Sequence, residues 1–298
     1  SGRWIMLVTE GQSIGFYGSA DLRSWTHLSS FGEGHGRHSP GPWECPDMMP
    51  LAAPDGEIHW LLIVGLNPGG YAAGSGTQYF IGRFDGTAFT NANPPETELW
   101  LDYGRDYYAA QTFFERGSTN APIAVAWASN WLYARQTQTQ AFRGVMSLPR
   151  ELRLVDTPDG LRVAAHVPLA VQSVIGATDR PGTGRCDLMA DLAVGEHLAI
   201  TLFGEDRPHF IVQRSAERRG SIRTIRHPVS GMDRFDHDYT VDLPWPDGDV
   251  LDITLFIDRG LVELSAADGL VWITNLFYPE HPEAGLRADT RRPEPVHA

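Results

Sequence analysis

The sequence contains no lysine, and all 24 basic side chains are arginine, against 37 acidic ones. Without lysine, chemistry that needs a Schiff base on the protein is excluded. The formal net charge of −13 also argues against nucleic acid or an anionic membrane as the main partner, because both require a basic surface. We therefore expect neither nucleic acid nor a membrane as a partner.

Cysteine and long apolar runs are scarce as well. Cys45 and Cys186 are the only two cysteines, so one bridge is possible but a disulfide framework is not. No run approaches the ~18 apolar residues of a membrane-spanning helix. The chain opens in a predicted strand, with neither an initiator methionine nor a signal peptide, so its first residues do not place it in a compartment.

What the sequence does contain is typical of a β-rich protein. It has 31 glycines, 21 prolines and 31 aromatic side chains (9 Trp, 9 Tyr and 13 Phe), a mixture of turn-forming and strand-forming residues. Short aromatic and β-branched runs, each bounded by turn residues, predict strands in the first 155 residues, where no helical apolar period is sustained. These predicted strands are Trp4–Thr9, Ser13–Gly18, His59–Gly65, Gln78–Phe84, Tyr107–Phe114 and Ile123–Ala128.

Two segments of this region are alike. Gly2–Trp25 and Glu57–Phe89 both read as a strand, a hairpin, a second strand and an aspartate-containing turn ahead of an aromatic residue. A period of roughly 60 residues suits the four-stranded blade of a β-propeller. Two unrelated hairpins of an ordinary β-domain are the alternative. We predict that residues 1–155 form propeller blades.

The composition changes after residue 155. Residues 156–185 hold several glycines and prolines and only weak strand signals, which predicts a linker. From residue 186 to 298, longer strands of alternating character predict a β-sandwich, with a hairpin turn at Asp268-Gly269 and a polar tail after Pro279 on the surface. The predicted sandwich strands are Cys186–Val194, His197–Phe203, His209–Arg214, Gly220–Ile225, Val250–Asp258, Leu261–Ser265 and Leu270–Phe277.

The densest group of reactive side chains is Trp43–Asp47, which reads Trp-Glu-Cys-Pro-Asp. Beside a buried thiol and an aromatic wall, the carboxyl group of Glu44 would favour its protonated form, which suits a general acid. A solvated loop glutamate is the alternative. His35 and His38 precede this group, but no third metal ligand is evident, so we interpret them as loop histidines.

Two further clusters follow. Asp102–Ala109 offers two aspartates and an arginine, which could hold polyol hydroxyls through paired hydrogen bonds or form a salt-bridged turn. Trp127–Trp131 has two indoles four residues apart with an amide between them. It could form a stacking wall for a sugar ring or lie in the core.

Together and in this order, these clusters resemble glycoside hydrolase family 32, which includes invertases, exo-inulinases and levanases. Trp43–Asp47 is similar to the acid/base motif of the family and Leu101–Ala110 to its substrate-holding stretch. Trp127–Trp131 and Arg143–Leu152 resemble its last propeller blade, and Gly260–Leu264 with the Asp-Gly turn resembles its sandwich. The resemblance implies an all-β fold, part of a five-bladed propeller followed by a β-sandwich.

The resemblance also implies a retaining mechanism on β-fructosides. An aspartate attacks the fructosyl carbon, and a glutamate ~5–5.5 Å away protonates the leaving oxygen and later activates water. Glu44 corresponds to this acid/base, Asp102 and Arg105 to residues that hold the leaving-group sugar, and Trp131 to a wall of the fructose pocket. No cofactor and no metal are implied. The substrate-binding residues predicted in this way are Trp43, Cys45, Asp102, Arg105, Asp106 and Trp131.

One departure from the family is large. The nucleophile of the family lies in an Asn-Asp-Pro-Asn-Gly stretch and its second essential aspartate in Arg-Asp-Pro, and neither stretch occurs here. We therefore expect the second half of a β-fructosidase, with about two and a half to three blades of five. We expect it to be inactive alone and completed by an amino-terminal chain or segment.

The leading function is hydrolysis of terminal β-fructosyl units of levan, inulin or sucrose. The alternatives are a fructosyltransferase of the same family (levan or inulin fructotransferase) and an inactive carbohydrate-binding remnant. The size of polymeric fructans predicts a secreted or extracellular protein.

Overall fold

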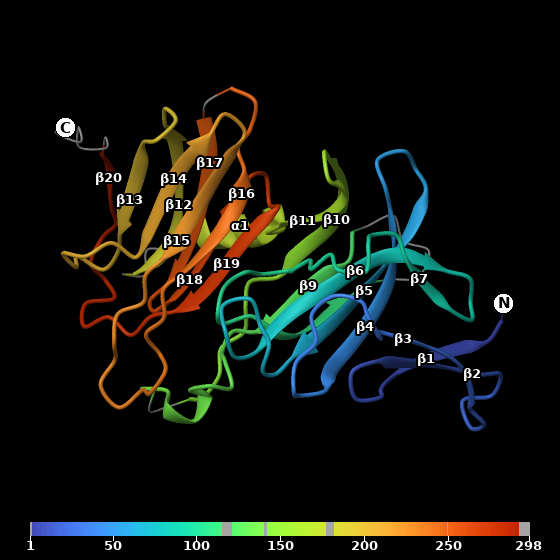
Figure 1. Ribbon diagram of the computed structural model, residues 1–298. Helices are drawn as coiled ribbons and strands as arrows, with labels where there is room; N and C mark the ends of the chain where they lie inside the picture. Colours follow the sequence, from blue (N-terminus) through green and yellow to red (C-terminus); the bar gives the residue numbers. More distant parts are fainter. Residues whose placement is uncertain (1, 115–120, 140–141, 177–181, 249, 292–298) are drawn as a thin grey trace. The chain divides into compact units, whose positions relative to one another are not determined.

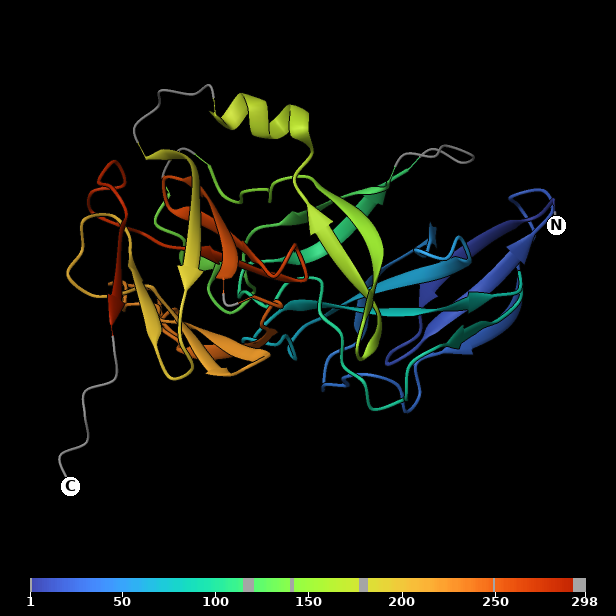
Figure 2. The same cartoon turned by 90° about the horizontal axis from the view of Figure 1, so that it is seen from above.

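The computed structural model describes residues 2–114, 121–139, 142–176, 182–248 and 250–291 (Figures 1 and 2). These residues fall into two compact units, Ser1–Trp131 with Gly144–Pro168, and Leu132–Arg143 with Leu169–Ala298. Both units are built of antiparallel sheets, so the all-β class predicted from the sequence is confirmed.

The first unit contains three sheets, each of which joins strands that follow one another in the chain, as in the blades of a propeller. The sheet orders are β1-β2-β3, β4-β5-β6-β7 and β11-β10-β9-β8. The strands are β1 (Trp4–Thr9), β2 (Ile14–Ser19), β3 (Thr26–Phe31), β4 (Trp43–Ala52), β5 (Ile58–Leu66), β6 (Gly76–Phe84), β7 (Phe89–Asn91), β8 (Tyr108–Phe113), β9 (Ile123–Trp127), β10 (Arg150–Thr157) and β11 (Gly160–His166).

The internal repeat seen in the sequence is present in the structure, where β1–β3 correspond to β5–β7. Asp21 Oδ1 accepts hydrogen bonds from the backbone N–H groups two and three residues further on, both at 2.8 Å. Asp85 Oδ1 does the same at 2.7 and 2.8 Å. These backbone bonds lower the pKa of both carboxyl groups. The two aspartates therefore shape equivalent turns between the strands.

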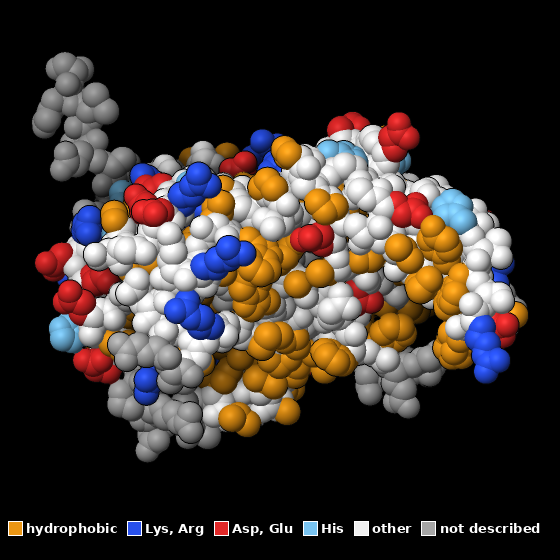
Figure 3. Space-filling model, turned by 90° about the horizontal axis from the view of Figure 1, so that it is seen from below, with side chains coloured by type: hydrophobic (Ala, Val, Ile, Leu, Met, Phe, Trp, Pro, Cys, Tyr) orange, Lys and Arg blue, Asp and Glu red, His pale blue; other side chains and the backbone are white. Residues whose placement is uncertain are grey.

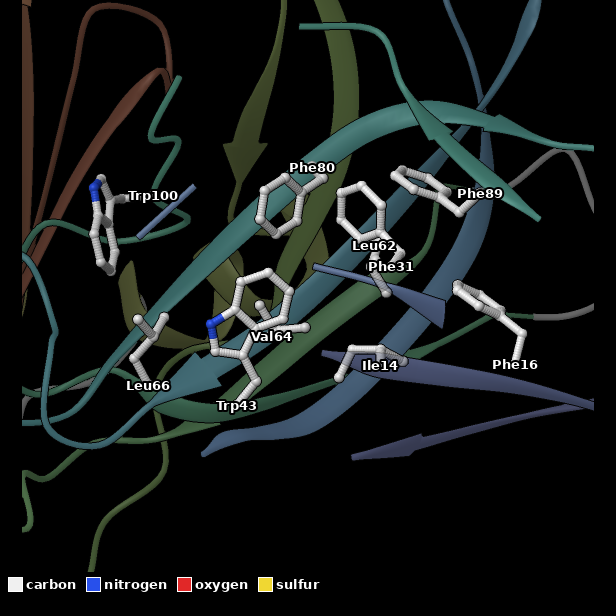
Figure 4. Packing of buried hydrophobic residues seen from close by; sticks show 10 residues of the cluster. All are labelled: Ile14, Phe16, Phe31, Trp43, Leu62, Val64, Leu66, Phe80, Phe89 and Trp100. Atoms are coloured by element: carbon white, nitrogen blue, oxygen red, sulfur yellow. The ribbon is translucent and has the colours of Figure 1, made fainter. Parts of the chain in front are cut away.

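The core of the first unit lies between the first two sheets (Figure 4). The indole of Trp43 is fully buried there, and its ring centroid lies 5.5 Å from that of Phe80. Burial of each such side chain stabilises the fold by about 1.5–3 kcal/mol. The buried residues of this cluster are Ile14, Phe16, Phe31, Trp43, Leu62, Val64, Leu66, Phe80, Phe89 and Trp100.

The second unit is formed by two sheets, with orders β12-β17-β18-β19 and β16-β15-β14-β13-β20. Burial alternates along β16, as expected for a strand with one face against a second sheet. The seven strands predicted for the sandwich are present, and β16 and β20 add to them. The strands are β12 (Thr183–Asp191), β13 (His197–Thr201), β14 (Phe210–Ala216), β15 (Arg219–Thr224), β16 (Tyr239–Pro244), β17 (Val250–Asp258), β18 (Leu261–Ala266), β19 (Val271–Leu276) and β20 (Arg287–Arg291).

A segment distant from the sandwich in sequence belongs to the second unit. Residues 132–143, which contain the 3-10 turn η1 (Ala134–Gln136), place Tyr133 in a buried cluster with Met232 and Phe235. Arg226 donates a hydrogen bond to the hydroxyl of Tyr133 at 2.7 Å, and its guanidinium lies 3.8 Å from the centre of the Phe235 ring. This segment is therefore an integral part of the second unit.

The boundary between the units differs from the predicted linker at 156–185. Strands β10 and β11 pair over Glu151–His166, so the first unit extends to Pro168. The Gly- and Pro-rich composition that suggested a linker belongs in part to this hairpin. Helix α1 (Leu169–Gly176) follows, and residues 177–181 lie outside the described residues. No helix in the described part of the chain is long and apolar enough to cross a membrane.

Candidate active site

Glu44 is the second residue of β4 and lies next to a β-bulge. Glu44 pairs with Gly65 and Asp47 with Ile63, so that two residues of β4 face one residue of β5. Cys45, the first residue of the bulge, has a φ of 51°, which is uncommon for a residue with a Cβ atom. The bulge interrupts the regular alternation of side chains immediately after Glu44. It therefore changes the direction in which β4 runs next to this residue.

A matching bulge lies in β8. Tyr108 pairs with Trp127 and Gln111 with Val125, and Ala109 between them also has a φ of 51°. The two bulges are joined by side chains. Gln111 Nε2 donates to the carbonyl oxygen of Cys45 at 3.3 Å. Both the backbone N–H and the hydroxyl of Thr112 donate to Asp47 Oδ2, at 2.7 and 2.6 Å.

The two bulged strands bring Tyr108 to Glu44, and the hydroxyl of Tyr108 donates a hydrogen bond to Glu44 Oε2. Gly65 makes this approach possible, because a Cβ atom at that position would lie 2.8 Å from the Tyr108 ring. Burial, followed by the bond to Glu44, raises the pKa of Tyr108 well above its ordinary value. The phenol therefore stays protonated and acts as a donor to the carboxylate.

An aromatic wall extends from Tyr108 toward solvent. The ring centroids of Tyr108 and Trp127 are 6.5 Å apart, and those of Trp127 and Trp131 are 5.0 Å apart. Trp131 is 50% exposed, so part of its indole faces solvent. Aromatic faces of this kind suit the apolar face of a sugar ring. Through Tyr108 and Trp127, the structure brings the predicted residues Glu44 and Trp131 to one site.

Trp131 is held in place by its neighbours. Its backbone N–H donates to the hydroxyl of Ser75 at 3.2 Å. The side-chain amide of the adjacent Asn130 donates to the carbonyl oxygen of Arg105 at 2.7 Å and accepts from the N–H of Ser75 at 3.3 Å. The amide noticed between the two tryptophans thus connects the wall to the segment that contains Arg105.

Asp102, Arg105 and Asp106 are all buried, with 2%, 2% and 0% of their surface exposed. Asp102 Oδ2 accepts from Arg150 at 2.8 Å, and its Oδ1 accepts from the N–H of Gly104 at 2.7 Å. The guanidinium of Arg150 lies 4.5 Å from the centre of the Tyr107 ring. Asp102 is therefore one half of a buried ion pair. The contacts with substrate expected of these three residues stay predictions.

Trp43 and Cys45 flank Glu44 but differ in their surroundings. The buried indole of Trp43 donates to the carbonyl oxygen of Arg37 at 3.2 Å and stacks on His38 with ring centroids 5.1 Å apart. The structure thus gives Trp43 a packing role, and its contact with substrate stays a prediction. Cys45 is partly exposed, and burial followed by the charge of Glu44 raises the pKa of its thiol.

His38 uses both ring nitrogens, one toward the turn between β1 and β2 and one within its own loop. One lies 2.9 Å from Gln12 Oε1 and the other 3.0 Å from the carbonyl oxygen of Gly32. Among the described residues, neither His35 nor His38 belongs to a group of three side chains able to hold a metal ion. Both histidines lie in the loop between β3 and β4.

Comparison with known proteins covers most of the chain. The pattern described as Glycosyl hydrolases family 32 N-terminal domain matches residues 1–164, and the pattern for the carboxy-terminal domain of the same family matches residues 194–291. A levanase of Bacillus subtilis is 31% identical over 95% of this chain and 46% of its own length. An extracellular exo-inulinase of Meyerozyma guilliermondii is 30% identical over 93% of this chain and 60% of its own.

Among solved structures, the exo-inulinase of Aspergillus awamori superimposes with a TM-score of 0.82 and 26% identity. The match covers 97% of this chain and 62% of that protein. The chain therefore spans about half to three fifths of the length of the relatives named here.

Proposed function

Because this chain belongs to glycosyl hydrolase family 32, we propose that it carries the acid/base side of a retaining β-fructosidase active site. The observation that supports this most directly is Glu44 itself. It lies at a bulge, accepts a hydrogen bond from the protonated Tyr108 and stands at one end of an aromatic wall. A carboxyl group fixed in this way can exchange a proton with a bound sugar.

In the proposed reaction, Glu44 gives its proton to the glycosidic oxygen as the bond to the fructosyl carbon breaks. It later takes a proton from the water that releases fructose. Tyr108 donates to Oε2 of Glu44, and we assign the other carboxyl oxygen to the substrate. Trp131 and Trp127 would support the fructosyl ring, and Asp102 and Arg105 would act on the side of the leaving group.

We assign the attacking carboxylate to a segment outside residues 1–164 and 194–291, which are the parts of this chain that match the family. The printed sequence lacks both Asn-Asp-Pro-Asn-Gly and Arg-Asp-Pro, and Asp47, the carboxylate nearest to Glu44 in sequence, is engaged by Thr112. We propose that an amino-terminal chain or segment supplies the nucleophile and packs on the first unit. Exposed apolar side chains on β1 and β8, with Trp4 57% and Phe113 68% exposed, support such a partner. Figure 3 shows that hydrophobic side chains also gather in patches on one face of the molecular surface.

The proposed substrates are levan, inulin or sucrose, with release of terminal fructose. Relatives of the chain include levanases, exo-inulinases and invertases, and the exo-inulinases of Meyerozyma guilliermondii and Aspergillus awamori are described as extracellular. We therefore also propose that the protein acts outside the cell.

The decisive experiment is fructose release by this chain mixed or co-expressed with the part of a family relative that precedes the matched region. We expect the reconstituted enzyme to release free fructose from levan, inulin or sucrose. Difructose anhydride or longer oligosaccharides would instead indicate a fructosyltransferase.

In that enzyme, Glu44→Gln should lower turnover by about two to four orders of magnitude, the usual contribution of a general acid. Glu57→Gln is the matched control, because Glu57 lies on the surface and pairs with Arg83. A Glu44→Gln enzyme that keeps more than about a tenth of the activity would remove Glu44 from the acid/base role.

A further inference from the structure

A fully buried amide links the two sides of the proposed active site. Asn130 has 0% of its surface exposed, precedes Trp131 of the aromatic wall and is bonded to the segment that contains Arg105. Within the proposed function, Trp131 supports the fructosyl ring and Arg105 acts on the side of the leaving group. The role inferred below for Asn130 rests on that function.

Both ends of this amide are in use. Its Nδ2 group donates to the carbonyl oxygens of Arg105 at 2.7 Å, Ala73 at 3.1 Å and Ser75 at 3.4 Å. Its Oδ1 atom accepts from the backbone N–H of Ser75 at 3.3 Å. Because the carbonyl oxygens need a donor and the N–H needs an acceptor, neither a carboxylate nor an apolar side chain suits this position. Buried backbone groups that lose such partners are costly.

The loop that receives the amide closes tightly on itself. Residues 67–75 join β5 to β6, and the backbone N–H groups of Gly69 and Gly70 both donate to the carbonyl oxygen of Gly74, at 2.9 and 2.8 Å. Gly74 has a φ of 72°, and a Cβ atom there would overlap the amide oxygen of Asn130. The loop therefore presents a preformed surface against which the amide is fixed.

The same loop also holds the aromatic wall directly. The hydroxyl of the buried Ser75 accepts from the backbone N–H of Trp131 at 3.2 Å. Strand β6 begins at the next residue, Gly76, which pairs with β5. The start of β6 thus carries two contacts, one to Trp131 through the Ser75 hydroxyl and one to Arg105 through Asn130.

We propose that Asn130 is a positioning residue, which holds the fructosyl wall and the leaving-group segment at a fixed spacing at the start of β6. Because it is fully buried, it acts through Trp131 and Arg105 rather than on the sugar itself. Half of the Trp131 side chain is exposed, so the position of its indole depends strongly on the backbone that Ser75 and Asn130 hold. Loss of these contacts should therefore weaken substrate binding more than proton transfer by Glu44.

Two variants separate the two contacts. Ser75→Ala removes the acceptor of the Trp131 N–H and keeps the backbone groups that bond to Asn130. Asn130→Ser shortens the side chain and removes the bond to the carbonyl oxygen of Arg105. Ser19→Ala is the matched control, because Ser19 is a buried serine of the same unit whose hydroxyl accepts from a backbone N–H at 2.9 Å, in the turn that follows β2.

The first readout requires no enzymatic activity. The full chain is labelled with 5-fluorotryptophan, and the fluorine resonance of Trp131 is identified by its loss in Trp131→Phe. Ser75→Ala and Asn130→Ser should each shift or broaden this resonance, and Ser19→Ala should not. Circular dichroism confirms folding; if Asn130→Ser does not fold, Gly74→Ala takes its place, since its methyl group displaces the amide and leaves every hydrogen-bonding atom present. A Trp131 resonance unchanged in the folded variants would overturn the proposal.

The second readout uses the reconstituted enzyme. Ser75→Ala and Asn130→Ser should raise KM for sucrose and the inhibition constant of free fructose by about two- to tenfold, as expected for the loss of a buried hydrogen bond. Only Asn130→Ser should also change the ratio of kcat/KM on sucrose to that on inulin, because it alone releases the leaving-group segment. A purely structural role would instead lower kcat on every substrate by one factor with KM unchanged, and that result would overturn the proposal.

Failure of this proposal can be told apart from failure of the proposed function. A wild-type reconstituted enzyme that releases no fructose would overturn the proposed function. Fluorine spectra of the chain alone that do not respond to either variant would overturn the positioning role of Asn130, whatever the activity of the enzyme.

Discussion

At the scale of single residues, the alternation of a β-strand decides which part of the Trp-Glu-Cys-Pro-Asp motif reaches the site. Neighbouring side chains of a strand point to opposite faces, so Trp43 enters the core while Glu44 faces Tyr108. The motif predicted Glu44, but it could not separate the two roles. The sequence did not assign Tyr108 to the site. The direction of a strand side chain is predicted from the two-residue period, and the bulge at Ala109 breaks that period next to Tyr108.

Cys45 gives a residue-scale test that requires no enzymatic activity. Its thiol pKa is raised by burial and by the charge of Glu44, so thiolate is scarce at neutral pH and reaction with a disulfide reagent should be slow. Glu44→Gln removes the charge and should speed the reaction of Cys45 at mildly alkaline pH. The rate is measured against pH in a Cys186→Ser background. Equal rates in Glu44→Gln and the Glu57→Gln control would contradict an effect of the Glu44 charge on this thiol.

Tyr108→Phe tests the hydrogen bond to Glu44. The ring and its packing on Trp127 are kept while the donor is lost. Because the hydroxyl donates to Glu44, kcat of the reconstituted enzyme should fall by about 10–100-fold with KM little changed. Tyr17→Phe is the control, since Tyr17 forms the same kind of bond with Glu10. A rise in KM with constant kcat would assign Tyr108 to substrate binding instead.

At the scale of elements, the strands could be predicted but their connections could not. The aromatic and β-branched runs marked β1, β2, β5, β6, β8 and β9, because these strands bury residues in recognisable patterns. Strand β10 was not among the predicted strands, and only its last two residues lie in the predicted linker at 156–185. Its place is determined by pairing with β9, where Arg150 lies opposite Ala124, and such long-range pairing leaves little trace in local composition.

The buried pair of Asp102 and Arg150 connects the loop before β8 to the first residue of β10. Asp102→Ala leaves the guanidinium of Arg150 buried opposite an apolar group, and it should lower the free energy of unfolding by about 3–5 kcal/mol. Urea denaturation measures this loss. Combining Asp102→Ala with Arg150→Met should recover part of it, because the unpaired charge is then removed.

If the double variant is no more stable than Asp102→Ala, the ion pair is not the source of the loss. In reconstituted enzyme that remains folded, Asp102→Ala should also raise KM or shift the ratio of transfer to hydrolysis. An unchanged profile on sucrose would leave Asp102 with a structural role alone.

At the scale of the whole molecule, the repeat and the change in strand character predicted a propeller part followed by a sandwich, and the structure has both. What remained hidden depends on contacts between distant segments. Residues 132–143 belong to the second unit through the contacts of Tyr133. The bonds of Asn130 to Ser75 and to Arg105 likewise join segments that lie far apart in the sequence.

The isolated 298-residue chain should show near-background fructose release from sucrose, inulin and levan. The sequence lacks the stretches that hold the nucleophile and the second essential aspartate of the family. The exposed apolar side chains of the first unit should also make the isolated chain associate with itself. Product analysis and light scattering on mass-verified protein test the two expectations. Clear turnover by a monomer would contradict the first and would point to Asp47, Asp102 or Asp106 as the nucleophile.

The path of the chain between its two units has a consequence for how these proteins can be recombined. The chain passes from one unit to the other after Trp131, after Arg143 and after Pro168. A single crossover near residue 168, which would seem the natural place to exchange sandwiches between homologues, therefore leaves Tyr133 from one parent facing Arg226 from the other. A chimaera that inherits the loop of residues 132–143 together with its sandwich keeps the parental pairing, and only such double exchanges transfer the unit whole.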